Sequence, residues 1–166
     1  MNAMRIHRIG PIDEGEPPLR LDRVEVPVPG VGEVLIRVHA CGVCHTELDE
    51  IEGRTPPPRL PMTPGHQVVG TVEEEGPGCL MELAGKRVGV AWIHSACGHC
   101  AWCREGRENL CPDAVFTGYH RPGGFAADSV RWPRWRLYRV PDPWPAVVER
   151  GLHDRDGVFH ATQPAL

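Results

Sequence analysis

Residues 33–52 read EVLIRVHACGVCHTELDEIE, a pattern that predicts a strand followed by a short helix. Glu33–Ala40 is nearly continuous in apolar character, which is typical of a buried strand. The helix is expected at Glu47–Glu52, before a proline-rich loop. Further strands, rich in valine and interrupted by glycine, are predicted at Val24–Val28, Gln67–Val72 and Arg87–Ile93. Several short strands with Gly/Pro turns between them predict a mainly β fold, a sandwich or a small barrel.

The composition limits the classes of function. The 166 residues are enough for one domain with a core, and 41% hydrophobic and 24% charged residues are ordinary for a soluble globular protein. A net charge of -4 without a basic block argues against nucleic acid as a partner. No apolar stretch has the length of a signal sequence or a membrane span, so we expect no membrane partner and a cytoplasmic location.

Four cysteines crowd into the segment CGHCAWCREGRENLC, with the spacing C-x2-C-x2-C-x7-C. Short Cys-x2-Cys steps let two thiolates from one turn reach the same ion, and a longer return supplies the remaining corner of a tetrahedron. We therefore predict a structural zinc site in a lobe of about residues 95–113, with His99 as an exposed loop residue. An iron–sulfur cluster is the alternative, although the x7 gap does not fit the usual bacterial run. The predicted zinc ligands are Cys97, Cys100, Cys103 and Cys111.

A second group of metal-ligating residue types lies upstream. It consists of CGVCHTE at residues 41–47 and PGHQ at residues 64–67. Taken alone, one CxxC and one distant histidine are a weak indication of a metal site, because buried thiols and a satisfied core histidine also explain them.

The order of the motifs adds information. CGVCHTE, PGHQ, G-x-R-V-G-V at residues 85–90 and the four-cysteine lobe follow one another as in the zinc-dependent medium-chain alcohol dehydrogenases, which this sequence resembles over roughly residues 4–142. The segments Glu52–Pro56 and Phe116–Ala126 resemble those of a bacterial branch of that family. The resemblance implies a GroES-like small β-barrel and oxidation of an alcohol to an aldehyde or ketone, with hydride transfer to NAD(P).

The resemblance also implies roles for individual residues. Cys44 and His66 match two of three catalytic zinc ligands, whereas Cys41 matches a non-ligand. Glu47 matches the carboxylate that orients the ligand imidazole. Thr46 matches the hydroxyl that hydrogen-bonds the substrate alcohol and begins a proton relay.

Four further positions carry expectations or departures from the family pattern. His45 occupies the place where an Arg or His meets the cofactor pyrophosphate, and Trp92 corresponds to an aromatic residue of the substrate pocket. For Trp92, a plain core tryptophan is the alternative. Gln67 stands where most members carry a glutamate close to the zinc. Asp49 replaces the usual relay histidine, and a carboxylate there would pass protons at a different working pH.

The sequence lacks two parts of the family pattern. No cysteine follows Cys111 to serve as the third catalytic ligand, and no G-x-G-x-x-G of a Rossmann domain is present. We expect residues 1–142 to form the catalytic domain and residues 143–166 a divergent tail whose order stays open. The interpretation is a truncated or frame-shifted product, or a short protein that works beside a Rossmann partner or a second copy. Two functions follow: a dehydrogenase domain that needs such a partner to bind NAD(P), or a non-catalytic zinc-binding module.

Overall fold

The computed structural model describes residues 1–12, 15–79, 82–124, 129–133 and 138–139, the last two segments by their backbone alone. The elements in chain order are β1 (Asn2–Ile6), β2 (Leu19–Arg23), β3 (Glu33–Gly42), α1 (His45–Glu52), β4 (Gln67–Glu75), β5 (Arg87–Val90), β6 (Ile93–Ser95), α2 (Ala101–Arg104), η1 (Glu108–Leu110), β7 (Val115–Phe116), β8 (Ser129–Pro133) and β9 (Tyr138–Arg139). The predicted mainly β class is therefore confirmed. The predicted tail, residues 143–166, lies outside the described residues.

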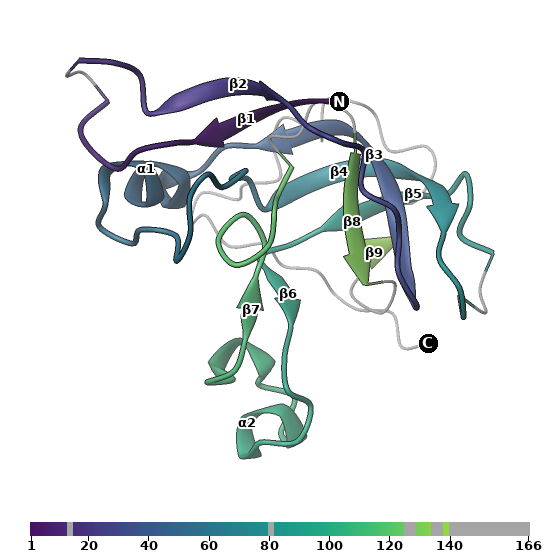
Figure 1. The fold of residues 1–166 in the computed structure, drawn as a ribbon. Helices are drawn as coiled ribbons and strands as arrows, with labels where there is room; N and C mark the ends of the chain where they lie inside the picture. The colour runs from purple at the N-terminus through teal and green to yellow at the C-terminus, as the bar shows by residue number, and fades with distance from the viewer. Residues whose placement is uncertain (13–14, 80–81, 125–128, 134–137, 140–166) are drawn as a thin grey trace.

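Three antiparallel sheets organise the part of the chain that the structure describes. The largest has the order β8-β3-β4-β5-β9, and two-stranded sheets join β1 to β2 and β6 to β7 (Figure 1). The β6–β7 hairpin, with α2 and η1 at its tip, projects away from the main sheet, while α1 lies beside β1 and β2. Among the described residues, no helix has the length and apolar character needed to cross a membrane.

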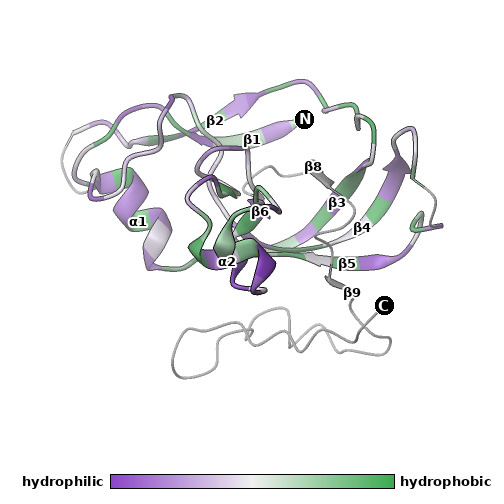
Figure 2. Ribbon diagram, turned by 90° about the horizontal axis from the view of Figure 1, so that it is seen from below, coloured by the Kyte–Doolittle hydropathy of each residue, from purple (hydrophilic) through white to green (hydrophobic). Residues whose placement is uncertain are grey.

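The core is built mainly from β-branched residues of the central strands. Val34 and Ile36 of β3 pack with valines of β4 and β5, and Figure 2 shows hydrophobic segments along these strands. β-Branched side chains pack well on a pleated surface, which is why these valine-rich segments form strands. The strand predictions at Glu33–Ala40 and Gln67–Val72 are confirmed, with each strand two or three residues longer than expected.

Two strand predictions need correction. Val24–Val28 is not a strand, because the strand lies just upstream at Leu19–Arg23. Val24 still exchanges two backbone hydrogen bonds with Met1, but the prolines at 27 and 29 have no N–H to continue the ladder.

The predicted strand Arg87–Ile93 is divided into β5 and β6. Between them, the hydroxyl of Thr117 donates to the carbonyls of Ala91 (2.8 Å) and Trp92 (3.1 Å), and the amide of Thr117 donates to the same Trp92 carbonyl. These carbonyls are therefore bonded to the turn after β7. The break turns the chain out of the main sheet and into the projecting hairpin.

Candidate metal centres

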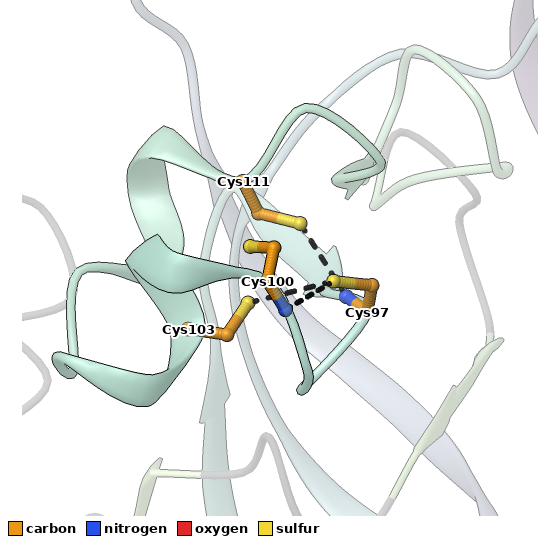
Figure 3. A group of neighbouring side chains, drawn as sticks. All are labelled: Cys97, Cys100, Cys103 and Cys111. Carbon is orange, nitrogen blue, oxygen red and sulfur yellow. Dashed lines mark hydrogen bonds between the residues drawn. The ribbon is translucent and has the colours of Figure 1, made fainter.

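The four cysteines of the lobe converge on one point (Figure 3). Their Sγ atoms all lie within 4.8 Å of one another, and those of Cys97 and Cys103 are 3.9 Å apart. Four sulfurs bound to one zinc at roughly 2.3 Å would be about 3.8 Å apart, so the spacing fits a tetrahedral site. Cys97 and Cys100 lie before or at the start of α2, Cys103 lies within it, and Cys111 follows η1. The cluster could therefore hold zinc, as the spacing predicts.

Backbone amides prepare the first of these thiols for metal binding. Hydrogen bonds from the backbone of His99 and Cys100 lower the pKa of Cys97 to about 6. Burial, in contrast, raises the pKa of Cys103 to about 12, and its neighbouring thiols add to the effect. Metal binding requires deprotonated sulfur, so occupation of the site releases protons. The side chain of His99 itself is exposed and contacts the Cys97 carbonyl, as expected for a loop residue outside the ligand set.

The lobe has little hydrophobic core of its own. Neither α2 nor η1 contains a buried residue, and Trp102 lies over the guanidinium of Arg107 near the surface. Such a segment buries too little apolar area to fix its own conformation. Metal coordination is the interaction that would hold it.

The second centre forms where β3 ends and α1 begins. Cys44 is the N-cap of α1, and its Sγ accepts a hydrogen bond from the amide of Thr46 at 3.3 Å. The Glu47 carboxylate completes a capping box by accepting from the amide of Cys44 at 2.8 Å. A reciprocal cap of this kind satisfies two free N–H groups at the helix start. The cap fixes the thiol at the junction between strand and helix. The helix predicted at Glu47–Glu52 is confirmed, with two extra residues at its start.

Glu47 also contacts the histidine of the second motif. Its Oε1 lies 2.8 Å from Nδ1 of His66, and both side chains are almost fully buried. The other ring nitrogen, Nε2, faces Sγ of Cys44 at 3.5 Å. The carboxylate therefore occupies one side of the imidazole and leaves the opposite side toward the thiol. Cys44, Glu47 and His66 form the second group of the described residues that could hold a metal ion.

The ionisation of this group follows from burial and charge. Burial alone would raise the pKa of Glu47, but its contact with His66 and the charge of that imidazole hold the pKa below its usual value. Burial is the main cause that raises the pKa of the Cys44 thiol, and the negative charge of Glu47 adds to it. A cation between Cys44 and His66 would supply the positive charge that favours the thiolate.

Close backbone packing holds the His66 turn in place. Gly123 donates its amide to the carbonyl of Thr63, and Gly124 donates to the carbonyl of Gly65, directly before His66. A Cβ at Gly123 would overlap the Gly65 carbonyl oxygen. The loop after β7 therefore approaches the histidine turn more closely than any side chain permits.

Gly123→Ala is expected to destabilise the fold by about 3 kcal/mol, because the Gly65 carbonyl must move to make room and carries His66 with it. Gly85→Ala is the matched control, since a Cβ there meets open space and costs only the strain of a positive φ, about 1 kcal/mol. Urea unfolding of the three proteins measures the difference. Equal losses for the two variants would mean that the overlap is relieved without cost.

The remaining predicted residues lie around this centre. Thr46 and His45 occupy the first turn of α1, with His45 exposed and its Nε2 3.6 Å from the carboxylate of Asp49. The carboxylate of Asp49 pairs with Arg54, and this hydrogen bond is the main cause that raises the pKa of the Arg54 guanidinium. Trp92 meets the ring of His66 edge to face, with centroids 4.8 Å apart.

Gln67 and Cys41 lie next to the centre but outside the groups of described residues that could hold a metal. Gln67 is the first residue of β4 and pairs with Gly42 of β3, which brings the two motifs side by side. Cys41 contacts the Gly42 carbonyl and stays outside both groups that could hold a metal. Burial raises the pKa of Cys41 to about 12, so its thiol is neutral.

Sequence reasoning missed Glu50. It lies one helical turn after Glu47, is only 1% exposed, and neither carboxylate oxygen has a hydrogen-bond partner. Burial first, and the charge of Glu47 second, raise the pKa of Glu50 to about 8. The i, i+3 spacing from Glu47 could have indicated that both carboxylates share the buried face of α1.

Glu50 is expected to make the fold less stable as pH rises. An unfolded Glu50 loses its proton near pH 4.5 and the folded one near 8, so stability falls between these values and is constant above them. Glu50→Met is expected to be more stable than wild type at pH 8. The difference in unfolding free energy between the variant and wild type should grow, in favour of the variant, by on the order of 2–5 kcal/mol from pH 4.5 to pH 8. Urea unfolding at pH 5, 6.5 and 8 tests this, with exposed Glu52→Met as control. A pH-independent difference for Glu50→Met would contradict the expectation.

Comparison with known proteins gives the family. Residues 30–142 match the family model described as the alcohol dehydrogenase GroES-like domain. The chain belongs to this family. An alcohol dehydrogenase of Geobacillus stearothermophilus is 47% identical over 132 residues, which are 79% of this chain and 39% of that protein.

Solved structures of related enzymes agree with this assignment. A cobalt- and zinc-bound thermostable alcohol dehydrogenase from Pyrobaculum aerophilum is 30% identical, with a TM-score of 0.71 over 84% of this chain and 41% of its own. An NAD-dependent alcohol dehydrogenase is 30% identical, with a TM-score of 0.76 over 87% of this chain and 41% of its own. The chain therefore spans well under half the length of the family members it matches.

Proposed function

We propose that this chain supplies the zinc-binding catalytic domain of an alcohol dehydrogenase, which oxidises an alcohol to an aldehyde or ketone with hydride transfer to NAD(P). The observation that carries the proposal is the pair formed by Cys44 Sγ and His66 Nε2, 3.5 Å apart, with Glu47 on the far side of the imidazole. A thiolate and an imidazole supported by a carboxylate are a donor set that suits zinc. Membership of the alcohol dehydrogenase family supports the same assignment.

Within this proposal, zinc at Cys44 and His66 supplies Lewis acidity toward the alcohol oxygen. Glu47 holds the tautomer of His66, because its carboxylate faces Nδ1 and leaves Nε2 for the metal side. Thr46, two residues after Cys44 on the first turn of α1, would hydrogen-bond the substrate hydroxyl and take up its proton while releasing its own hydroxyl proton to the next group of the relay.

Asp49 receives the proton in the proposed relay. It lies one turn after His45 on α1, and Arg54 holds its carboxylate in place through the ion pair. His45 is exposed at the start of α1, where a cationic or hydrogen-bonding side chain and a helix N-terminus suit a cofactor pyrophosphate. Trp92 forms a wall of the alcohol pocket, and Gln67 takes the place of a carboxylate near the zinc.

The proposed domain comprises residues 1–142, with the zinc lobe at about 95–113. The third ligand of the catalytic zinc and the dinucleotide-binding fold are assigned to a Rossmann domain, supplied by additional sequence or by a partner chain. A non-catalytic zinc-binding module is the second candidate. It is favoured by one observation, namely that the four-cysteine cluster forms a full ligand set without any such partner.

Joining residues 1–142 to the remaining part of the Geobacillus stearothermophilus alcohol dehydrogenase tests the proposal. We expect the hybrid to reduce NAD in the presence of simple alcohols and to lose that activity on addition of a strong zinc chelator. Cys41→Ser is the matched control for Cys44→Ser, because both are cysteines of one motif and only Cys44 belongs to the group that could hold a metal. A folded hybrid that binds NADH and two zinc ions but oxidises no alcohol would favour the non-catalytic module.

A further inference from the structure

A series of aromatic rings leads away from the proposed ligand His66. His66 meets Trp92 edge to face at 4.8 Å, and Trp92 stacks on Phe116 at 4.7 Å with 16° between the ring planes. Phe116 in turn stacks with His120 at 5.6 Å and 20°. Aromatic pairs in these geometries contribute beyond the apolar area that they bury. The series joins the metal centre to the turn after β7.

The turn is closed by the side chain at its end. The amide of Phe116 donates to Nδ1 of His120 at 3.0 Å, and the amide of His120 donates to the carbonyl of Phe116 at 3.0 Å. Inside the turn, the hydroxyl of Thr117 donates to the Trp92 carbonyl at 3.1 Å. Residues 116–120 therefore contact Trp92 in two ways: Thr117 bonds its backbone carbonyl, and Phe116 stacks on its ring.

We propose that His120 is a positioning residue, which closes the Phe116–His120 turn and thereby fixes the indole of Trp92 against His66. Two properties of the imidazole are needed together. Its flat ring stacks on Phe116, and its unprotonated Nδ1 accepts the Phe116 N–H. Asparagine offers the acceptor without the ring, phenylalanine offers the ring without the acceptor, and tryptophan only donates.

The consequence for catalysis rests on the proposed function. If Trp92 forms a wall of the alcohol pocket, His120 sets the position of that wall from outside the pocket. Loss of His120 would then loosen the fit of the alcohol and leave the metal ligands, which are held by α1 and the Gly65 turn, in place. The expected kinetic signature is a higher KM with a nearly unchanged kcat.

The first test uses the 166-residue chain and needs no activity. The near-UV circular dichroism of Trp92, isolated by subtracting the spectrum of Trp92→Phe, is expected to fall by more than half in His120→Ala. It should fall less in His120→Asn and His120→Phe, each of which keeps one contact. Nitrogen-15 shifts of the wild-type ring should show Nδ1 without a proton. His99→Asn, at an exposed histidine, is the control.

An unchanged Trp92 band in a His120→Ala chain that keeps its zinc and its far-UV spectrum would overturn the proposal, as would a proton on Nδ1. If His120→Ala does not fold, His120→Asn and His120→Phe decide, and a full wild-type Trp92 band in both variants overturns the proposal.

In the hybrid enzyme, His120→Asn is expected to raise KM about fivefold with kcat within a factor of two. A fall in kcat without a rise in KM would contradict the positioning role of His120. A hybrid without any alcohol activity would reject the proposed function and leave the spectroscopic test of His120 valid.

Discussion

Replacing Cys103 with serine is expected to remove the tightly held zinc of the 166-residue chain and to loosen residues 95–113. Serine does not supply a thiolate, and loss of one ligand removes much of an apparent ~10–16 kcal/mol of binding free energy. Because α2 and η1 contain no buried residue, the lobe has no core to replace that contribution. Metal analysis after gentle chelation should give about one zinc for the wild type and well below one for the variant.

Amide hydrogen exchange localises the effect. The amides of the lobe should exchange much faster in Cys103→Ser, while those of β3 and β4 keep their protection, since the main sheet packs its own core. Cys79→Ser is the matched control, because Cys79 belongs to neither group that could hold a metal; its thiol donates to the Glu33 carbonyl at the edge of the core. Iron with visible charge-transfer bands in the purified chain would contradict zinc and favour the iron–sulfur alternative.

In the hybrid enzyme, His66→Ala is expected to lower kcat/KM by roughly three orders of magnitude or more, because the proposed catalytic zinc would lose a direct ligand. Glu47→Gln is expected to cost about 10–100-fold, since the imidazole remains but its orientation and basicity are no longer supported by a carboxylate. Glu47→Gln should also weaken the helix start, because the cap at Cys44 loses a charged acceptor.

Steady-state kinetics and zinc content, measured on the same preparations, separate these effects. Glu52→Gln on the exposed side of α1 is the control and should be nearly neutral. If Glu47→Gln costs as much as His66→Ala while zinc content is unchanged, Glu47 acts on the substrate rather than through the histidine. If His66→Ala keeps its activity, the assignment of His66 as a ligand is wrong.

Local features were predictable from the sequence, because the residues that decide them are neighbours in the chain. The four cysteines of the lobe lie within fifteen residues, so their spacing indicates a common ion before any fold is known. The strands β3 and β4 follow in the same way from their apolar runs, and the helix α1 from its place between the strand and the proline-rich loop. Predictions failed where pairing decides the outcome: Val24–Val28 has the alternation of a strand but not the amide groups to continue the ladder after Val24.

The second candidate metal centre was decided by tertiary structure. Cys44 and His66 are 22 positions apart, so the spacing alone was a weak indication of a site, and the resemblance to a family was needed to predict it. The antiparallel register of β3 and β4, with Gly42 opposite Gln67, brings the two motifs together. The neutral, buried Glu50 depends on which face of α1 the fold removes from water, and the aromatic series depends on tertiary contacts between Trp92 and the Phe116–His120 turn, so neither was visible in the sequence. Proximity along the chain determined the cysteine lobe, whereas strand register and burial determined everything around His66.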